Sequence, residues 1–580
     1  MTSNKMKRRL AGGQTLLLAT LLLGSATSCF DDSYDLKKDI DMTINVGGEH
    51  LAFPVGSTEK ITLDKIIEIE EGDDLQTDAN GAYHLLKSGE IDDITTDVKT
   101  ITVKATDTKI DPIEVANSTD FSGGKLTTET SNTKSKPIET SADDIDEAVK
   151  EIYSLTTSTP IKIILEKGGE MNLAELDATV TIQFSPVMQV EGADENNRIT
   201  FPLNERDLSE GSYEHEVNLT GFVFGDGNKG NGKVIGEDHR IDISEEVTVT
   251  VDAKVTVSSV QAGDELTLTP TIHIEDMTIT EASGIVEPSL DESTSSMELN
   301  NLPDFLENEE TQLDITNPIF TFHAYNPLDI DVEITGTLSG MKNGTLINGS
   351  EVQIGGENTE RIILHPGDNT ISLSRLGNGG PEESQNIKVE DLNNLIQTIP
   401  DKVNVTIQPT VICDDYFSIK LGSTYTVDCN YDIDVPLSFG SGLNIVYEET
   451  IDDLGGDMED FDVYEAVLTA SVDNTIPLAM ELTNDNVEVL DGAGQKIESV
   501  TVSVTGDIKA GDGTEQPVNS QLDINLKTTE KGVLNRLDAI RLKITAKSGT
   551  TTDKQLYESQ WIQLKDIKLK LPKGVTVDMN

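Results

Sequence analysis

The stretch from Phe320 to Ile334, FTFHAYNPLDIDVEI, decides the fold. Nearly all of its apolar side chains occupy even-numbered positions, on both sides of an Asn-Pro pair at Asn326 and Pro327. A period of two places these side chains on one face of a β-strand, whereas a helix would need a period near 3.6. A proline inside such a run predicts a bulge, a sheet edge or a strand that switches sheets.

The same pattern returns 148 residues later, from Leu468 to Leu482 (LTASVDNTIPLAMEL), with Asn474 at the position of Asn326. A weaker third copy runs from Val180 to Val190 and is interrupted at Pro186. We expect Asn326 and Asn474 to be equivalent irregular points that make local hydrogen bonds to the backbone. A repeat of about 150 residues is too long for a solenoid unit and fits a β-domain of ordinary size.

A second repeated element, a pair of strand patterns separated by a turn, supports this organisation. It occurs at 244–279, at 400–437 and at 540–572. Many short strands with turn residues between them, and few helices, predict an all-β protein built from tandem β-sandwiches, Ig-like in the loose sense. Short capping helices are expected where apolar residues have helical spacing, at 141–155, 389–399 and 532–540.

These patterns predict a linear order of domains. The expected order is a signal peptide at 1–28, an N-terminal tether and β-domain at 29–143 whose segment 117–140 is a Ser/Thr-rich linker, and sandwiches at 144–290, 291–442 and 443–580. In such an array the C-terminal domain stands farthest from the start of the chain. Lysines at 565–573 alternate there with apolar residues, which indicates either a guarded sheet edge or a contact site for an anionic partner.

Composition excludes several classes of protein. The chain has 580 residues, with 43 Lys and Arg against 104 Asp and Glu, for a formal net charge of −61. A nucleic-acid binder is excluded because phosphate contacts need clustered basic residues. The longest apolar run, 16–23, is far shorter than the roughly 20 residues of a membrane-spanning helix.

The N-terminal region carries an export signal. Basic residues at 5–9 precede an apolar segment at 15–23 and the small residues GSATS, which end at Cys29. This arrangement resembles a bacterial lipoprotein signal of the relaxed kind found in Bacteroidota, and the acidic FDDSYD that follows resembles their surface-export tag. The resemblance implies attachment of a diacylglyceryl group to the Cys29 thiol through a thioether, cleavage before Cys29, and anchoring to the outer membrane, facing the exterior. The alternative for the signal is an ordinary secretory signal followed by a chance cysteine. The alternative for the acidic segment is a solvated, flexible tether.

The search for catalytic or metal chemistry yields one weak candidate. No pair of histidines has zinc-site spacing and no GxSxG motif occurs, so we expect neither an enzyme nor a cofactor. GDGNKG (225–230) matches GxGxxG, but no helix pattern follows it, as dinucleotide binding would require. Asp226, Asn228 and Glu237 have the spacing of a loose calcium loop, although Asn231 stands where an EF-hand has glycine. A mobile hairpin tip is the preferred interpretation.

Two further cysteines, Cys413 and Cys429, are symmetric about Leu421 and flank a candidate turn. A hairpin there would bring the thiols together in an oxidising compartment, and the bond would contribute about 3 kcal/mol. Two buried thiols are the alternative.

The first functional hypothesis is a non-enzymatic surface lipoprotein that acts as an adhesin, a stalk or an assembly component. The alternative is a surface glycan-binding protein that serves a carbohydrate importer. Glycan sites use exposed aromatic rings, and this chain has 13 Phe, 11 Tyr and one Trp, Trp561, which alternates within a strand pattern expected to face the core. The ligand, protein or glycan, is not identified by the sequence.

Overall fold

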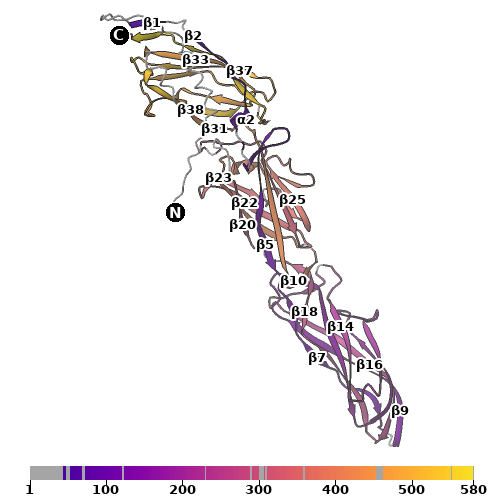
Figure 1. Ribbon diagram of the computed structural model, residues 1–580. Helices are drawn as coiled ribbons and strands as arrows, with labels where there is room; N and C mark the ends of the chain where they lie inside the picture. The colour runs from indigo at the N-terminus through magenta and orange to yellow at the C-terminus, as the bar shows by residue number, and fades with distance from the viewer. Residues whose placement is uncertain are drawn as a thin grey trace.

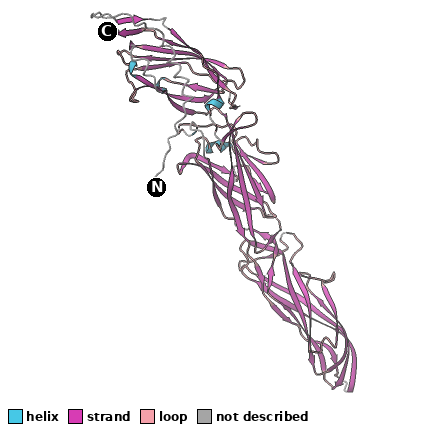
Figure 2. Ribbon diagram, in the orientation of Figure 1, coloured by secondary structure: helices cyan, strands magenta, loops and turns pink. Residues whose placement is uncertain are grey.

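The computed structural model describes residues 43–46, 52–67, 69, 72–119, 123–228, 230–287, 290–299, 306, 308, 310–356, 359–413, 415–451, 462–549 and 552–578. Regular structure in these residues is nearly all β, which confirms the all-β prediction (Figure 2). The helices described are short, with three to six residues each: α2 (Leu63–Ile66), η1 (Glu390–Leu395), η3 (Asn484–Asn486) and η4 (Leu534–Arg536).

The strands form three units, each with two main facing sheets, arranged along a rod (Figure 1). We call the unit that contains both described chain ends the terminal sandwich. Its main sheets have the orders β2-β40-β33-β37-β36 and β31-β38-β34. Its strands are β1 (Thr43–Val46), β2 (Ala52–Gly56), β3 (Ile61–Thr62), β31 (Ile445–Ile451), β32 (Asp462–Val463), β33 (Glu465–Asn474), β34 (Leu478–Glu481), β35 (Val487–Asp491), β36 (Thr501–Thr505), β37 (Val518–Lys527), β38 (Leu537–Ser548), β40 (Trp561–Lys570) and β41 (Val575–Asp578).

The middle sandwich pairs the sheet β26-β25-β21-β29-β5-β4 with the sheet β20-β27-β22-β23. Its strands are β4 (Leu75–Thr77), β5 (Tyr83–Asp97), β20 (Ser293–Glu298), β21 (Ile319–Asn326), β22 (Val332–Lys342), β23 (Thr345–Ile354), β24 (Ile362–Leu364), β25 (Gly367–Ser374), β26 (Gln385–Lys388), β27 (Lys402–Val411) and β29 (Thr424–Pro436). A two-stranded bridge, β30 (Ser438–Phe439) with β39 (Lys554–Gln555), joins it to the terminal sandwich.

The distal sandwich pairs the sheet β12-β14-β10-β17-β7 with the sheet β13-β11-β16-β9. Its strands are β6 (Ile101–Val103), β7 (Thr106–Lys109), β8 (Ile113–Asn117), β9 (Gly123–Ala142), β10 (Val149–Gly169), β11 (Asn172–Gln183), β12 (Met188–Val190), β13 (Arg198–Asn204), β14 (Ser212–Val223), β15 (Lys233–Val234), β16 (Ile241–Val260), β17 (Glu265–Ile274), β18 (Met277–Ile279) and β19 (Glu281–Val286). One strand from the middle part of the chain, β28 (Phe417–Lys420), is added to β19.

The chain path is nested rather than linear. The described part of the chain starts in the terminal sandwich at β1, crosses the middle one along β5, builds the distal one, and then returns through the middle one to the terminal sandwich (Figure 1). The first and last described strands pair with each other, with Thr43 opposite Asp578. The distal sandwich therefore lies farthest from both described ends of the chain, whereas the expectation put the C-terminal domain farthest from the start; the C-terminal strand β41 instead pairs with the first described strand, β1.

The nested path corrects the expected domain at 29–143. Its described strands are shared among all three sandwiches, since β2 pairs with β40, β5 with β29 and β9 with β16. The segment 117–140, expected to be a linker, is mostly β9, which pairs with β16 along nearly its whole length. Its Ser, Thr and Lys content suits an edge strand, where few side chains are covered.

The helix expected at 141–155 is also corrected. The Asp146 carboxylate accepts a hydrogen bond from the Ala148 amide at 3.0 Å and holds a turn. The chain then enters β10, whose first residues pair with β19 on one side and with β15 and β14 on the other. Two flanking strands outweigh a local helical pattern, since propensity is a weak prior. The helices expected at 389–399 and 532–540 are shorter than predicted, namely the 3₁₀ helices η1 and η4 of six and three residues.

The predicted strand switch is confirmed at both asparagines. Asn326 ends β21 in one sheet of the middle sandwich, and the chain continues as β22 in the opposite sheet. The Asn326 side chain, 1% exposed, donates to the carbonyls of Ile330 (2.8 Å) and Leu364 (3.2 Å) and accepts from the Leu328 amide (3.0 Å). Asn474 repeats these contacts between β33 and β34, with bonds to the carbonyls of Leu478 and Lys509 and from the Ile476 amide at 2.9–3.0 Å.

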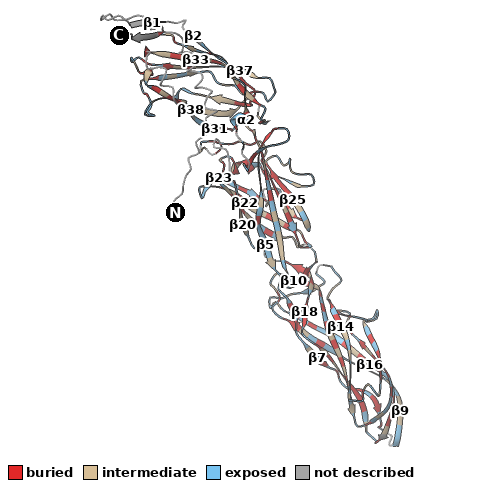
Figure 3. Ribbon diagram, viewed as in Figure 1, coloured by how far each residue is buried: buried red, intermediate tan, exposed pale blue. Residues whose placement is uncertain are grey.

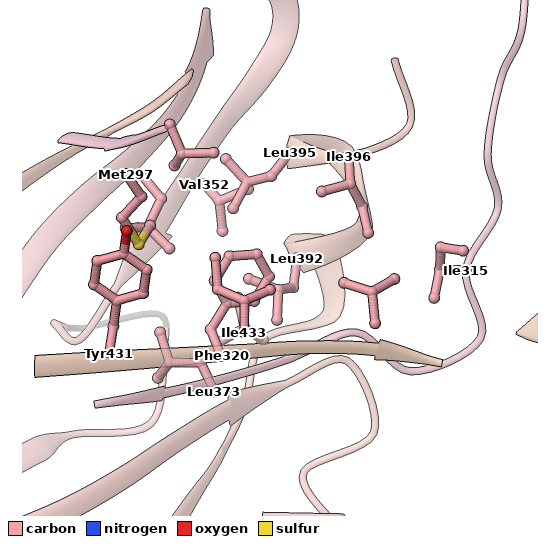
Figure 4. Packing of buried hydrophobic residues seen from close by; sticks show 14 of the residues in the cluster. Met297, Ile315, Phe320, Val352, Leu373, Leu392, Leu395, Ile396, Tyr431 and Ile433 are labelled. Carbon is pink, nitrogen blue, oxygen red and sulfur yellow. The ribbon is translucent and has the colours of Figure 1, made fainter. Parts of the chain in front are cut away.

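The cores lie between the paired sheets (Figure 3). In the middle sandwich, Phe320, Leu373 and Ile433 from one sheet face Val352 from the other, and η1 closes one end with Leu392 (Figure 4). The same buried cluster continues into the terminal sandwich. Gly89 is required on β5, because a Cβ there would lie 2.6 Å from the hydroxyl of Tyr431.

Candidate functional site

The joint between the middle and distal sandwiches combines a buried carboxylate with a cleft. Here β28, from the middle part of the chain, pairs with β19 of the distal sheet, with Phe417 opposite Gly284. The crossing segment is tied down as well, since Val98 exchanges backbone hydrogen bonds with Gly422 and Ser423 at 2.9–3.0 Å. Backbone pairing on two sides predicts a stiff joint.

A buried carboxylate, that of Glu151 on β10, lies at the centre of this joint. Glu151 is 6% exposed and accepts hydrogen bonds from the Gly230 amide (3.1 Å), the Gly232 amide (2.5 Å) and the hydroxyl of Tyr416. The ring of Tyr416 stacks on Tyr153 with centroids 5.4 Å apart. A buried charge with several donors is stable because its lost hydration is replaced.

These contacts change the interpretation of GDGNKG. The amide of Gly230, the last glycine of the motif, and the amide of Gly232 just after it both donate to the protein's own Glu151, so these two amides are not free to bind a phosphate. The contact between Glu151 and Tyr416 could not be predicted from the sequence, because the two residues are 265 positions apart in the chain. No local pattern signals a contact of that range.

A cleft of about 180 Å³ opens beside this carboxylate. Lys99 and Asp146 form an ion pair at its rim, with Lys99 Nζ 3.2 Å from Asp146 Oδ2. The Ala148 amide, and then Lys99, lower the pKa of Asp146. Apolar side chains of both sandwiches form the rest of the wall: Val98, Ile101, Val149, Ile152, Ala282, Val286, Leu328, Phe417, Ile419 and Leu421.

The first residue of the calcium candidate is engaged by its own loop, and calcium binding there stays a prediction. Asp226 Oδ1 accepts hydrogen bonds from the Asn228 amide (3.1 Å) and from Asn231 Nδ2 (2.8 Å), as in a turn closed by its own aspartate. These bonds, that of Asn231 first, lower the pKa of Asp226. Glu237 is exposed. Among the described residues, no three His, Cys, Asp or Glu side chains are grouped to hold a metal ion.

The proposed disulfide is absent, since Cys413 and Cys429 are not bonded to each other. The expected hairpin about Leu421 does not form, because β28 pairs with β19 instead of β29. Cys429 instead lies in β29 between β21 and β5, opposite Ala324 and Ile91. Burial raises the pKa of the Cys429 thiol to about 11, which makes it a poor nucleophile.

The lysines near the C-terminus do not guard a sheet edge. β40 is an interior strand, with β2 on one side and β33 on the other, and Lys568 lies opposite Pro54. Lys568 itself is exposed. Trp561 is half-buried rather than in the core, and the Lys60 ammonium lies 3.8 Å from its ring centre.

The sequence also did not reveal an aromatic stack at the seam of the distal sandwich, where β13 of one sheet meets β14 of the other. His215 on β14 lies over Phe201 on β13, with ring centroids 4.1 Å apart, and Tyr213 lies 5.9 Å from Phe201. Burial lowers the pKa of His215. The alternation of Tyr213 and His215 on one strand face was the available signal, but the partner Phe201 lies on another sheet.

The remaining prediction, acylation at Cys29 after a signal at 1–28, falls outside the described residues.

Within the described chain, no helix has the length and apolar character needed to cross a membrane.

Comparison with known proteins adds little. No protein-family model and no curated protein matches the chain. A candidate secreted protein from Parabacteroides distasonis is similar over 50% of this chain and 89% of its own, at 14% identity and a TM-score of 0.36. Tripeptidyl peptidase 2 matches 83% of this chain and 36% of its own, at 7% identity and a TM-score of 0.15. A triple jelly roll protein of an archaeal virus turret matches 79% of this chain and 90% of its own, at 11% identity and a TM-score of 0.11. At these scores none of the three supports an argument about this chain.

Proposed function

We propose that this protein is a non-enzymatic surface lipoprotein, anchored to the outer membrane through Cys29, that holds its distal sandwich away from the cell as an adhesive or assembly tip. The nested path is the observation that carries the proposal. It puts both described chain ends in one sandwich and leaves the opposite end of the rod free of chain ends. An anchor near residue 29 then places the distal sandwich outermost.

Stiff joints support the proposed stalk. Between the terminal and middle sandwiches, β30 pairs with β39, the Leu556 amide donates to the Leu437 carbonyl at 2.9 Å, and Lys543 Nζ lies 2.6 Å from a Glu310 carboxylate oxygen. Because one buried cluster spans both units, bending there would expose apolar surface. The net charge of −61 keeps such rods apart in solution.

We take the three units to be Ig-like sandwiches in the loose sense, and the partner of the tip to be a protein. A glycan partner is the alternative. A glycan platform needs open ring faces. The rings of the distal seam cover one another instead, with Phe201 only 4% exposed. This favours a protein contact.

Epitope tags would test the proposal. One tag goes into the distal turn at Gly263 and a matched tag into the terminal-sandwich turn at Gly494, since an added Cβ at either glycine meets no atom within 4 Å. On intact cells we expect an antibody to bind the Gly263 tag more than the Gly494 tag. Cys29→Ala should release the protein from the membrane fraction. Stronger labelling at Gly494, or membrane retention of Cys29→Ala, would contradict the proposal.

A further inference from the structure

The cleft at the middle–distal joint has the size of a small-ligand site. Its volume is about 180 Å³. An apolar cavity of roughly 150 Å³ accommodates benzene, so this cleft has room for a ligand of about six to eight non-hydrogen atoms. Junctions between structural units are common positions for ligand sites.

The wall of the cleft is apolar and comes from both sandwiches. Val149 and Ala282 belong to distal strands, whereas Leu328 follows the Asn326 strand switch of the middle sandwich. Phe417 is the first residue of the added strand β28, and Leu421 follows its last residue. A ligand with an apolar body would therefore touch both units at once and exclude water from their junction.

The charge at the rim is unbalanced. Asp97, Asp144, Asp146 and Glu151 line the cleft, against a single ammonium, that of Lys99. Glu151 is engaged by glycine amides and Tyr416, and Asp146 by Lys99 and the Ala148 amide. Asp144 is exposed at the mouth and makes no ion pair or side-chain hydrogen bond with the described residues. The acidic excess favours a cationic group at the mouth.

From these observations we propose that the cleft binds a small amphiphilic cation, a primary ammonium on a short aliphatic body. The aliphatic body lies against Val149, Leu328 and Phe417, and the ammonium is held by Asp144. This site is independent of the proposed tip function, and its occupation joins the two sandwiches.

Calorimetric titration tests the site with hexylammonium chloride as the probe and sodium hexanoate as its charge-reversed control. The full mature chain is used, carrying Cys29→Ala so that it is free of lipid. We expect saturable one-site binding of hexylammonium and none of hexanoate. Asp144→Asn should weaken binding about tenfold, the effect of one hydrogen bond to a charged group. Ala148→Phe, which fills the cleft, should abolish it.

Glu147→Gln is the matched control, because Glu147 is exposed on the same turn and does not line the cleft. It should leave binding unchanged. Failure of hexylammonium to saturate, equal binding of hexanoate, or an Asp144→Asn variant that binds like the parent would overturn the proposal. Circular dichroism checks folding, and if Ala148→Phe does not fold, Asp144→Asn decides.

Discussion

The middle and terminal sandwiches are copies of one design, and the distal sandwich is not. Each sandwich contains the repeated pair of strands found at 244–279, 400–437 and 540–572; the pair is β27 and β29 in the middle sandwich and β38 and β40 in the terminal one. In these two sandwiches the strand before the switch asparagine pairs with the later strand of the pair, β21 with β29 and β33 with β40. The strand after the switch pairs with the earlier one, β22 with β27 and β34 with β38. In the distal sandwich, β11 pairs instead with β16, the earlier strand.

The switch itself is also made differently in the distal sandwich. Ser185 takes the place of the asparagine and accepts a hydrogen bond from the Val187 amide at 3.3 Å. The amide donor comes from another residue, Asn197, which bonds the carbonyls of Ser185 and Met188 at 2.6–2.7 Å. The comparison teaches that the sequence repeat is clear only where a single residue makes all the hydrogen bonds of the switch. The middle and terminal sandwiches each use one asparagine and have a strong repeat, whereas the distal sandwich divides the bonds between Ser185 and Asn197 and has a weak one.

Replacing a switch asparagine, Asn326 or Asn474, should give the largest loss of stability. Asn326→Val or Asn474→Val removes the donor that serves two backbone carbonyls and the acceptor that serves one backbone amide, and each variant should lose about 3 kcal/mol of unfolding free energy. Urea titration measures the loss. Asn430→Val, at an exposed position on β29, is the control and should change stability by less than about 0.5 kcal/mol. Parent-like stability of both switch variants would break the comparison.

The second-largest loss of stability is expected at the joint between the middle and distal sandwiches. Glu151→Ala leaves the Gly230 and Gly232 amides without their acceptor, and we expect a loss of about 2 kcal/mol with faster hydrogen exchange at both glycines. Glu166→Ala on the same strand removes only an exposed ion pair with Lys109 and should cost less than about 0.5 kcal/mol. Unchanged exchange at Gly230 and Gly232 would show that Glu151 does not hold the loop.

A smaller effect is expected at the distal switch, because Ser185 makes only part of the hydrogen-bond set. Ser185→Ala should lose about 1 kcal/mol, roughly a third of the effect at Asn326. The measurement is again urea titration. A loss as large as that of Asn326→Val would mean that the three switches are energetically alike and that the distal sandwich is a true third copy.

The smallest expected effect is on the pH dependence of stability, through His215. Burial keeps the pKa of His215 below its ordinary value, so the folded state favours the neutral ring. Its contribution to stability is present above the unfolded pKa of about 6.5 and is lost as the pH falls through the lower folded value. His215→Phe keeps a ring against Phe201 but cannot titrate, and should lose less stability than the parent between pH 7.5 and 5.5. Equal losses would rule His215 out as a contributor.

The features that could be predicted from the sequence are those set by residues close together in the chain. The period of two and the asparagines at 326 and 474 identified strands and their switch points, because both are set by neighbouring residues. Sequence reasoning failed for β9, whose Ser, Thr and Lys side chains resemble a linker although β16 pairs with it. It also missed the nesting and the Glu151 contact with Tyr416, because the pairing of strands far apart in sequence leaves no local signature.

The nested path, the central claim, is most directly tested by spin labels on the Cys-free mature chain. Ala52 and Lys570 face each other across β2 and β40, and Ala262 lies in the distal turn between β16 and β17. Labels at 52 and 570 should show strong dipolar broadening, and labels at 52 and 262 should show none. A linear array of domains predicts no broadening for the first pair, so a 52–570 spectrum equal to the sum of the two single-label spectra would contradict the nested fold.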